Sequence, residues 1–296
     1  MKKSILVAIC ATFGALLLAG TAPAGLILYE PFNGTTGSLL GQTNASNGMS
    51  WLRAGVSTAP TAINEVGGNL PLTNGMPAPI GNSVALTGIG DSSGSTDRLP
   101  LGTTISSGTV YYSFALRADD LTGSNNTIGG FFIAFNNTGN TSQSTNPSVT
   151  PARIQSRIDP SDASKYDLGI FNITATSSST SWGPAMTLGS THFIVAGYTF
   201  NTASTVDDVA SLWIDPDPNT FLGGVPPTPT VTGTGGDVTG AGILSLLLRQ
   251  SPAPKSTLDE IRVGTDWTSV TVPEPGTCVL LLSSCFFALV ARRRSA

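Results

Sequence analysis

The stretch VYYSFALR, residues 110–117, decides the fold class of this protein. Large apolar side chains occupy every second position from Val110 to Leu116. The positions between them run from Tyr111 to Arg117 and include a serine and an alanine. Successive side chains of a strand point to opposite faces, so this period of two predicts a β-strand with one buried face.

Ten more segments have the length and composition of strands, and polar turns separate them. Loops are expected at residues 136–150 and 223–240, and in a Ser/Gly-rich stretch that contains Asp91 and Asp97. Many short strands with polar turns predict an all-β fold of two packed antiparallel sheets, arranged as one domain. The ten segments are residues 26–29, 51–53, 83–87, 131–135, 153–158, 166–173, 192–200, 209–214, 243–249 and 258–263.

The composition agrees with an extracellular β protein. Charged residues make up 11% of the 296 residues, against about 25% in an average soluble domain. The three cysteines, Cys10, Cys278 and Cys285, all lie near the ends of the chain. The body between the ends therefore offers no disulfide framework, thiolate metal site or cysteine nucleophile.

The body is acidic. Between residues 25 and 272, nine Lys and Arg stand against 17 Asp and Glu, a net charge of −8 at neutral pH with His neutral. The sequence shows no cluster of basic residues in this region. Such a surface repels a phosphate backbone, so nucleic acid is excluded as a partner.

Residues 1–24 have the order of a secretory signal peptide. Lys2 and Lys3 form the charged start, residues 5–19 are apolar, and Ala22 and Ala24 precede a cleavage site before Gly25. The alternative is a buried N-terminal helix. The signal-peptide interpretation predicts delivery to a Sec-type export machinery.

The C-terminal end combines three parts: a Pro-Glu-Pro motif at Pro273, Glu274 and Pro275, an apolar segment at residues 276–291, and the basic cluster Arg292, Arg293 and Arg294. As a helix the apolar segment is about 24 Å long, enough for a single transmembrane helix if the bilayer thins. The arginines are expected to act as a stop-transfer signal on the cytoplasmic side. The two prolines keep the preceding chain extended, which suits recognition by a processing enzyme.

These three parts in this order resemble the PEP-CTERM sorting signal of Gram-negative bacteria. The resemblance implies that an exosortase recognises Pro273, Glu274 and Pro275, that the helix anchors the chain before processing, and that the product reaches the cell surface or extracellular matrix. It also implies an association with biofilm and exopolysaccharide. An ordinary C-terminal membrane tail is the alternative. The expected organisation is a signal peptide at residues 1–24, a body at 25–272 and a sorting signal at 273–296.

The body resembles concanavalin A-like and laminin-G-like jelly rolls. Residues 28–32 are similar to the opening strand of such domains, residues 207–216 to an inner strand, and residues 258–264 to the closing strand. The resemblance implies a two-sheet antiparallel jelly-roll sandwich.

Catalytic residues are scarce, and we predict that the protein is not an enzyme. His192 is the only histidine, so neither a His-based zinc site nor more than one Ser-His-Asp triad is available. Sugar-cleaving jelly rolls need paired carboxylates on one strand face. Asp259 and Glu260 are neighbours and are expected to point to opposite faces of a strand.

Two weaker binding sites are predicted. Calcium prefers oxygen ligands, and Asp207, Asp208, Asp215 and Asp217 flank one predicted strand and are candidate ligands; solubilising turn residues are the alternative. Trp182 follows a Ser/Thr-rich segment and is the candidate for stacking on a sugar. Trp213 alternates with Val209 and Ser211 inside a strand and is expected in the core.

Three functions remain open from the sequence. The first is a non-catalytic, exported structural or adhesive protein of the surface or matrix. The second is a lectin-like module that binds extracellular polysaccharide. The third is a glycan-active hydrolase or lyase.

Overall fold

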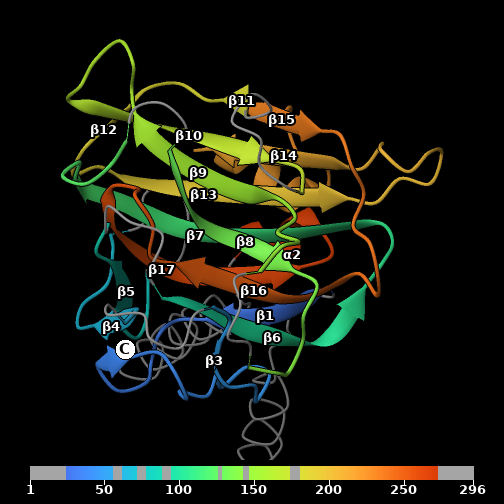
Figure 1. Ribbon diagram of the computed structural model, residues 1–296, viewed down its shortest axis with the longest axis horizontal. Coiled ribbons are helices and arrows are strands. Elements are labelled where there is room, and N and C mark those ends of the chain that lie inside the picture. Colours follow the sequence, from blue (N-terminus) through green and yellow to red (C-terminus); the bar gives the residue numbers. More distant parts are fainter. Residues whose placement is uncertain are drawn as a thin grey trace, which may run out of the picture.

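The computed structural model is a sandwich of two antiparallel β-sheets (Figure 1). It describes residues 25–55, 62–71, 78–88, 95–125, 129–142, 147–173 and 181–272. The predicted signal peptide and the sorting signal at residues 273–296 lie outside these residues. The predicted transmembrane helix and the three terminal arginines lie outside them as well.

The first sheet contains nine strands. β7 and β17 lie at its centre. β1 (Leu26–Glu30) also pairs with β17 but stands outside the linear order of the other strands. In spatial order the path is β15 (Val231–Thr234), β14 (Val209–Ile214), β13 (Thr191–Thr199), β7 (Thr109–Asp120), β17 (Lys255–Gly264), β5 (Ser83–Leu86), β4 (Asn64–Val66) and β2 (Gly37–Ser38).

The second sheet contains eight strands. β12 (Met186–Thr187) pairs with β10 beside the main path. The path is β11 (Ser181–Trp182), β10 (Lys165–Phe171), β9 (Arg153–Ile158), β8 (Gly130–Asn136), β16 (Ile243–Arg249), β6 (Thr96–Ile105) and β3 (Leu52–Arg53).

The main hydrophobic core lies between the two sheets. From β7 it receives Val110, Tyr112, Phe114 and Leu116, the set that the alternation predicts. The rings of Tyr112 and Phe135 of β8 meet edge to face with centroids 4.9 Å apart, which joins the sheets at the centre of the sandwich. The predicted jelly-roll sandwich is confirmed.

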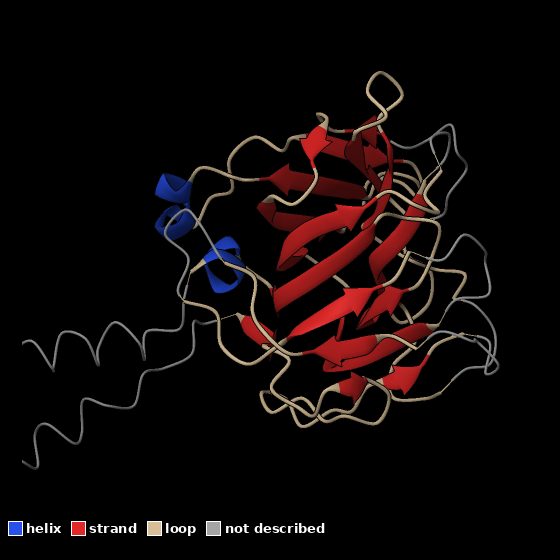
Figure 2. Ribbon diagram, turned by 90° about the vertical axis from the view of Figure 1, so that its left-hand side faces the viewer, coloured by secondary structure: helices blue, strands red, loops and turns tan. Residues whose placement is uncertain are grey.

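The opposite face of β7 is also covered, which the sequence did not indicate. The 3-10 helix η2 (Pro218–Gly223) and the helix α2 (Trp267–Thr271) lie together on one side of the molecule, beside the sheets (Figure 2). Tyr111, Trp213 and Trp267 form a second cluster with them, in which Trp213 is buried as predicted. The Ser113 hydroxyl donates a hydrogen bond of 2.6 Å to the Val270 carbonyl.

All eleven predicted strands are present, with ends that differ by a few residues. Two of the other strands lie in segments that the sequence analysis predicts as loops. β6 contains Asp97 in a charged stretch with a proline and a glycine, and β15 lies within residues 223–240. Asp97 is therefore a fully buried strand residue, and its prediction as a loop residue is wrong. Its local sequence favours a turn, whereas pairing of β6 with β16 supplies the strand.

Among the described residues, no helix is both long and apolar enough to cross a membrane.

Candidate functional site

Six side chains form an arginine–aromatic face on the outer side of the second sheet. In β8, β9, β10 and β16 the core takes Ile133, Ile154, Ile170 and Leu248. In β9, β10 and β16 the alternate positions therefore point away from the core. In β8 the pairing with β9 shifts register between Phe131 and Ile133, and Phe131 lies outside the main core cluster although it is two positions from Ile133. The face consists of Phe131, Arg153, Arg157, Phe171, Trp182 and Arg249.

Four strands, β8, β9, β10 and β16, contribute to one stack of guanidinium groups and rings. The guanidinium carbon of Arg153 lies 4.7 Å from the centroid of Phe131 and 4.8 Å from that of Phe171. The guanidinium carbon of Arg249 lies 4.6 Å from the same Phe131 ring. The two guanidinium carbons are therefore no more than 9.3 Å apart. The two rings are buried, while both arginines are half-buried, so each arginine keeps part of its surface in contact with solvent.

The two arginines have no acidic partner in the described part of the chain, where neither makes an ion pair. The Nε atom of each is buried without a hydrogen-bond partner. Burial and, as the smaller cause, the positive charge of Arg249 together lower the pKa of Arg153 to about 10. Burial also lowers the pKa of Arg249. The face thus holds two like charges that nothing in the described chain neutralises.

Trp182 lies at the other end of this face. The guanidinium carbon of Arg157 is 4.0 Å from the centroid of the Trp182 ring, and Arg157 also forms an ion pair of 3.0 Å with Asp167. The tryptophan is half-buried rather than freely exposed. A sugar that contacts Trp182 would therefore also meet Arg157, which occupies one face of the ring.

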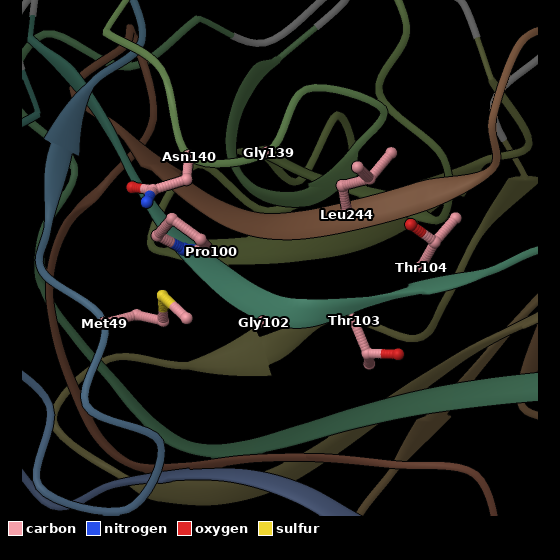
Figure 3. A pocket seen from close by; sticks show the side chains of 8 residues that line it. All are labelled: Met49, Pro100, Gly102, Thr103, Thr104, Gly139, Asn140 and Leu244. Carbon is pink, nitrogen blue, oxygen red and sulfur yellow. The ribbon is translucent and has the colours of Figure 1, made fainter.

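A shallow groove of about 220 Å³ lies near the opposite end of β16 (Figure 3). Its apolar lining includes Met49, Pro100 and Leu244, and its polar lining includes Thr104 and Asn140. Leu244 and Arg249 are five residues apart on one strand, or about 17 Å. The groove and the arginine–aromatic face are thus spaced along one strand at a distance that an extended chain molecule can span.

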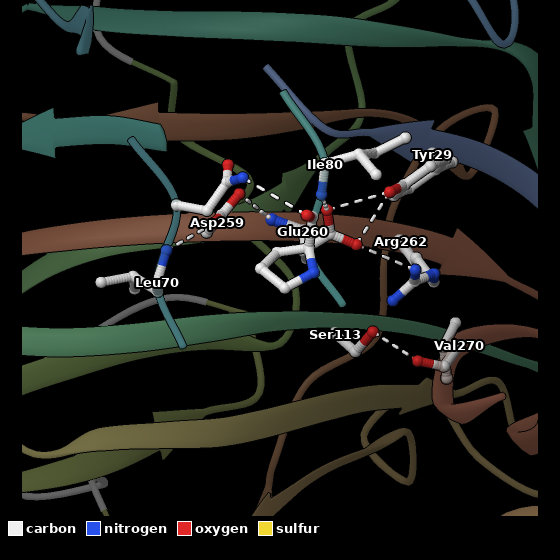
Figure 4. Close-up of polar contacts among 10 residues, drawn as sticks. Tyr29, Leu70, Ile80, Ser113, Asp259, Glu260, Arg262 and Val270 are labelled. Carbon is white, nitrogen blue, oxygen red and sulfur yellow. Dashed lines mark hydrogen bonds and ion pairs between the residues drawn. The ribbon is translucent and has the colours of Figure 1, made fainter. Parts of the chain in front are cut away.

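The adjacent carboxylates Asp259 and Glu260 are buried in a different part of the molecule, on β17 (Figure 4). Asp259 accepts a hydrogen bond of 2.8 Å from the Leu70 amide, and Glu260 one of 3.0 Å from the Ile80 amide. Glu260 also forms a buried ion pair of 3.0 Å with Arg262.

The prediction that Asp259 and Glu260 point to opposite faces is wrong. The pairing of β17 with β7 shifts register between Asp259 and Arg262, and Glu260 has a positive φ of 54°. Leu258 and Ile261 both reach the core although they are three residues apart, so strict alternation fails here. Both carboxylates instead hold the loops around Leu70 and Ile80.

The four predicted calcium ligands do not come together. Asp207 and Asp208 precede β14 while Asp215 and Asp217 follow it, which separates the pairs by about 20 Å along a six-residue strand. Asp237 joins the first pair instead, and its carboxylate accepts hydrogen bonds from the Asp207 and Asp208 amides. The second pair has local roles, because Asp217 caps η2 and Asp215 lies 2.7 Å from His192 Nδ1.

The sequence prediction included Trp182 but missed Arg153, Arg157 and Arg249. A signal was present, because Arg153, Gln155 and Arg157 follow each other at period two in a predicted strand. Six of the nine basic residues of the body lie in strands of the second sheet and outside its core cluster: Arg53, Arg98, Arg153, Arg157, Lys165 and Arg249. Spacing alone could not reveal that Arg249, almost 100 positions later, stacks on the same ring as Arg153.

The architecture defines the body as an antiparallel β-sandwich. Residues 271–294 match the PEP-CTERM protein-sorting motif, so the chain carries this signal directly after its folded body. The motif implies export, surface sorting and processing by an exosortase.

Comparison with curated protein sequences gives no match. Among solved structures, an endo-β-1,4-glucuronan lyase from the fungus Trichoderma reesei is similar at 12% identity, with 74% of this chain and 96% of that chain covered and a TM-score of 0.41. The Emp47p carbohydrate recognition domain is similar at 9% identity, with 83% and 99% covered and a TM-score of 0.39. An engineered GH43 glycoside hydrolase has 12% identity, 80% and 40% coverage and a TM-score of 0.43. At these identities and TM-scores, the likenesses assign neither a ligand nor an activity.

Proposed function

We propose that this protein is a non-catalytic adhesive protein of the cell surface or extracellular matrix, and that its sandwich holds extracellular polysaccharide. The arginine–aromatic face is the observation that carries the proposal. Its guanidinium groups and Trp182 offer both hydrogen-bond donors and a ring at the surface, which are the groups that bind sugars.

The shape of the outer face supports a chain ligand. The arginine–aromatic face and the groove at Leu244 lie about 17 Å apart on the line of β16, which is longer than a single sugar ring. The groove adds Thr104 and Asn140 as polar contacts. A polysaccharide that lay along this strand would meet both regions.

The predicted lack of catalysis is part of the proposal. His192 pairs with Asp215, and Asp259 and Glu260 are fully buried and engaged by backbone amides. A catalytic carboxylate must reach the bond that it cleaves. The two adjacent carboxylates of the body are therefore suited to hold loops and not to cleave a glycan.

The test is retention of the exported protein on immobilised polysaccharides. The protein is recovered from exporting cells, and columns carry the exopolysaccharide of those cells and a panel of purified neutral and acidic polysaccharides. We expect retention on at least the native polysaccharide, and weaker retention of a Trp182→Ala variant. Ile80→Ala is the matched control, because Ile80 is an exposed apolar residue away from this face.

Absence of retention on every polysaccharide would contradict the proposal. Release of shortened sugars from any of them would contradict the non-catalytic part and favour a glycan-active enzyme. Equal retention of the Trp182→Ala and Ile80→Ala variants would mean that the arginine–aromatic face is not part of the binding site.

A further inference from the structure

The charge of the arginine–aromatic face needs an explanation. The body has an excess of acidic residues, yet Arg153 and Arg249 lie close together without a carboxylate beside either of them in the described chain. By contrast Arg53, Arg117, Arg157 and Arg262 all form ion pairs. Arg153 and Arg249 differ from these four arginines, because neither has an ion pair among the described residues.

Packing alone does not account for the pair. Stacking on Phe131 stabilises each guanidinium group, but partial burial of two like charges opposes folding unless a negative charge compensates them. Their buried Nε atoms also lack acceptors. A ligand that brings an anion to the accessible part of the two side chains supplies the compensating negative charge.

We infer that Arg153 and Arg249 form a binding site for the carboxylate groups of an acidic polysaccharide, a polymer that contains uronic acid residues. This inference rests on the proposed function and names the class of glycan. The guanidinium group is planar and binds a carboxylate through two parallel hydrogen bonds. Phe131 and Phe171 fix the plane of Arg153, which limits the entropy that binding would cost.

A polymer fits this site better than a free anion. Arg157 and Trp182 extend the face beyond the arginine pair, and the groove at Leu244 extends it along β16. A chain with a carboxylate on each sugar can place one carboxylate at the arginine pair while neighbouring sugars contact the rest. Binding should weaken as salt rises, because charge attraction contributes to it.

The experiment measures binding of the exported protein to polygalacturonate by calorimetry. Dextran is the neutral polymer, dextran sulfate carries sulfate in place of carboxylate, and duplex DNA is the polyanion that is not a polysaccharide. We compare the native chain with an Arg153→Gln/Arg249→Gln variant. The control is Arg117→Gln/Lys255→Gln, which removes the same two charges from partly exposed positions of the first sheet.

We expect polygalacturonate to bind more tightly than dextran. The Arg153→Gln/Arg249→Gln variant should lose about tenfold or more in affinity, as for loss of charge-assisted hydrogen bonds. The control variant should keep the affinity of the native chain within about a factor of two. Because the described part of the chain gives the arginine pair no counter-charge, replacement of both arginines should leave the unfolding temperature unchanged or raise it, so that a loss of binding is not a loss of folding.

The other outcomes separate the inference from the proposed function. Equal binding of dextran and polygalacturonate would overturn the inference and leave polysaccharide binding in place. Tighter binding of dextran sulfate that depends on the same arginines would assign the pair to sulfate and overturn the carboxylate assignment. Binding of DNA alone, or of no polymer at all, would overturn both the inference and the proposed function. Equal losses in the two variants would show a general charge effect and overturn the site.

Discussion

Glu260 is a single side chain that joins three segments of the molecule. Its carboxylate accepts hydrogen bonds from the Tyr29 hydroxyl at 2.8 and 2.9 Å, from the Ile80 amide at 3.0 Å and from Arg262 at 3.0 Å. The residue is 1% exposed, and its backbone is held at a positive φ. These contacts compensate the strain and close the loop before β5 against β17 (Figure 4).

Replacement of Glu260 by glutamine tests this role. Glu260→Gln keeps the shape but leaves the charge of Arg262 buried without its partner, and breaking such a pair costs about 3–5 kcal/mol. We expect the free energy of unfolding in urea to fall by roughly that amount. Asp162→Asn is the control, because Asp162 and Lys165 form an exposed pair. A similar small loss in both variants would contradict the structural importance of Glu260.

Asp259 makes stability depend on pH. Burial raises its pKa to about 7 and raises that of Asp97 to about 6, against about 3.9 in an unfolded chain. Between about pH 4 and 7 the folded protein binds more protons at these sites than the unfolded chain does, so their contribution stabilises the fold as pH falls. At pH 8 the two buried charges oppose folding.

Urea unfolding of Asp259→Asn at several pH values checks this dependence. The variant cannot ionise at residue 259, so its stability should change less between pH 5 and 8 than that of the native chain. Asp162→Asn again serves as the control, because hydrogen bonds lower the pKa of Asp162 and it does not titrate in this window. An unchanged slope in the Asp259→Asn variant would mean that Asp259 is ionised throughout.

At the scale of single elements, two glycines with the same backbone conformation have different surroundings. Gly108 in the turn between β6 and β7 has φ of 71° and open space where a Cβ would lie. Gly129 before β8 has φ of 65°, but a Cβ there would lie 2.5 Å from the Ser156 carbonyl oxygen and 3.0 Å from the Trp182 ring. Gly129 thus allows β8 to approach β9 and Trp182.

The matched pair of alanine variants separates backbone strain from close contact. Gly108→Ala should cost about 1–2 kcal/mol from the left-handed conformation alone. Gly129→Ala carries the same strain and must also displace β9 or Trp182, so we expect a clearly larger loss of stability and a change in tryptophan fluorescence. Equal unfolding midpoints for the two variants would contradict the close packing at Gly129.

At the scale of the whole molecule, the described part of the body reaches residue 272 and so overlaps the start of the sorting motif. The motif starts at residue 271, the last residue of α2, which packs on η2 and β7. Contacts such as the Ser113–Val270 hydrogen bond therefore attach the end of the body to the sandwich. Processing beyond residue 272 would leave these contacts intact.

Removal of residues 273–296 tests the sorting role of the C-terminal end. A chain truncated after Val272 should be secreted into the medium, because it lacks the motif, the apolar segment and the arginines. Fractionation of membrane, surface and medium measures the change. Unchanged anchoring of the truncated chain would contradict sorting through this signal.

The intact mass of the native protein tests both processing events. A chain that starts at Gly25 and ends between Pro273 and Gly276 would agree with removal of the signal peptide and cleavage near the motif. A mass that retains Arg292, Arg293 and Arg294 would indicate a plain membrane anchor and contradict exosortase cleavage.

The sequence by itself determined the properties that depend on neighbouring residues. Alternation at residues 110–117 identified a strand and its core face, and the order of a Pro-Glu-Pro motif, an apolar segment and arginines identified the sorting motif. Both signals are complete within about 25 residues of chain. The class of the fold followed, because many short strands with polar turns have few ways to bury their apolar faces.

Only the tertiary structure decided which distant residues meet. β6 and β15 are strands because β16 and β14 offer them hydrogen bonds, although their own sequences favour turns. The bulge at Asp259 and Glu260 depends on the loops at Leu70 and Ile80, almost 200 residues earlier. Arg153 and Arg249 share the Phe131 ring through the order of strands in the second sheet. Sheet order and register arise from long-range packing, so a pattern of adjacent residues does not encode them.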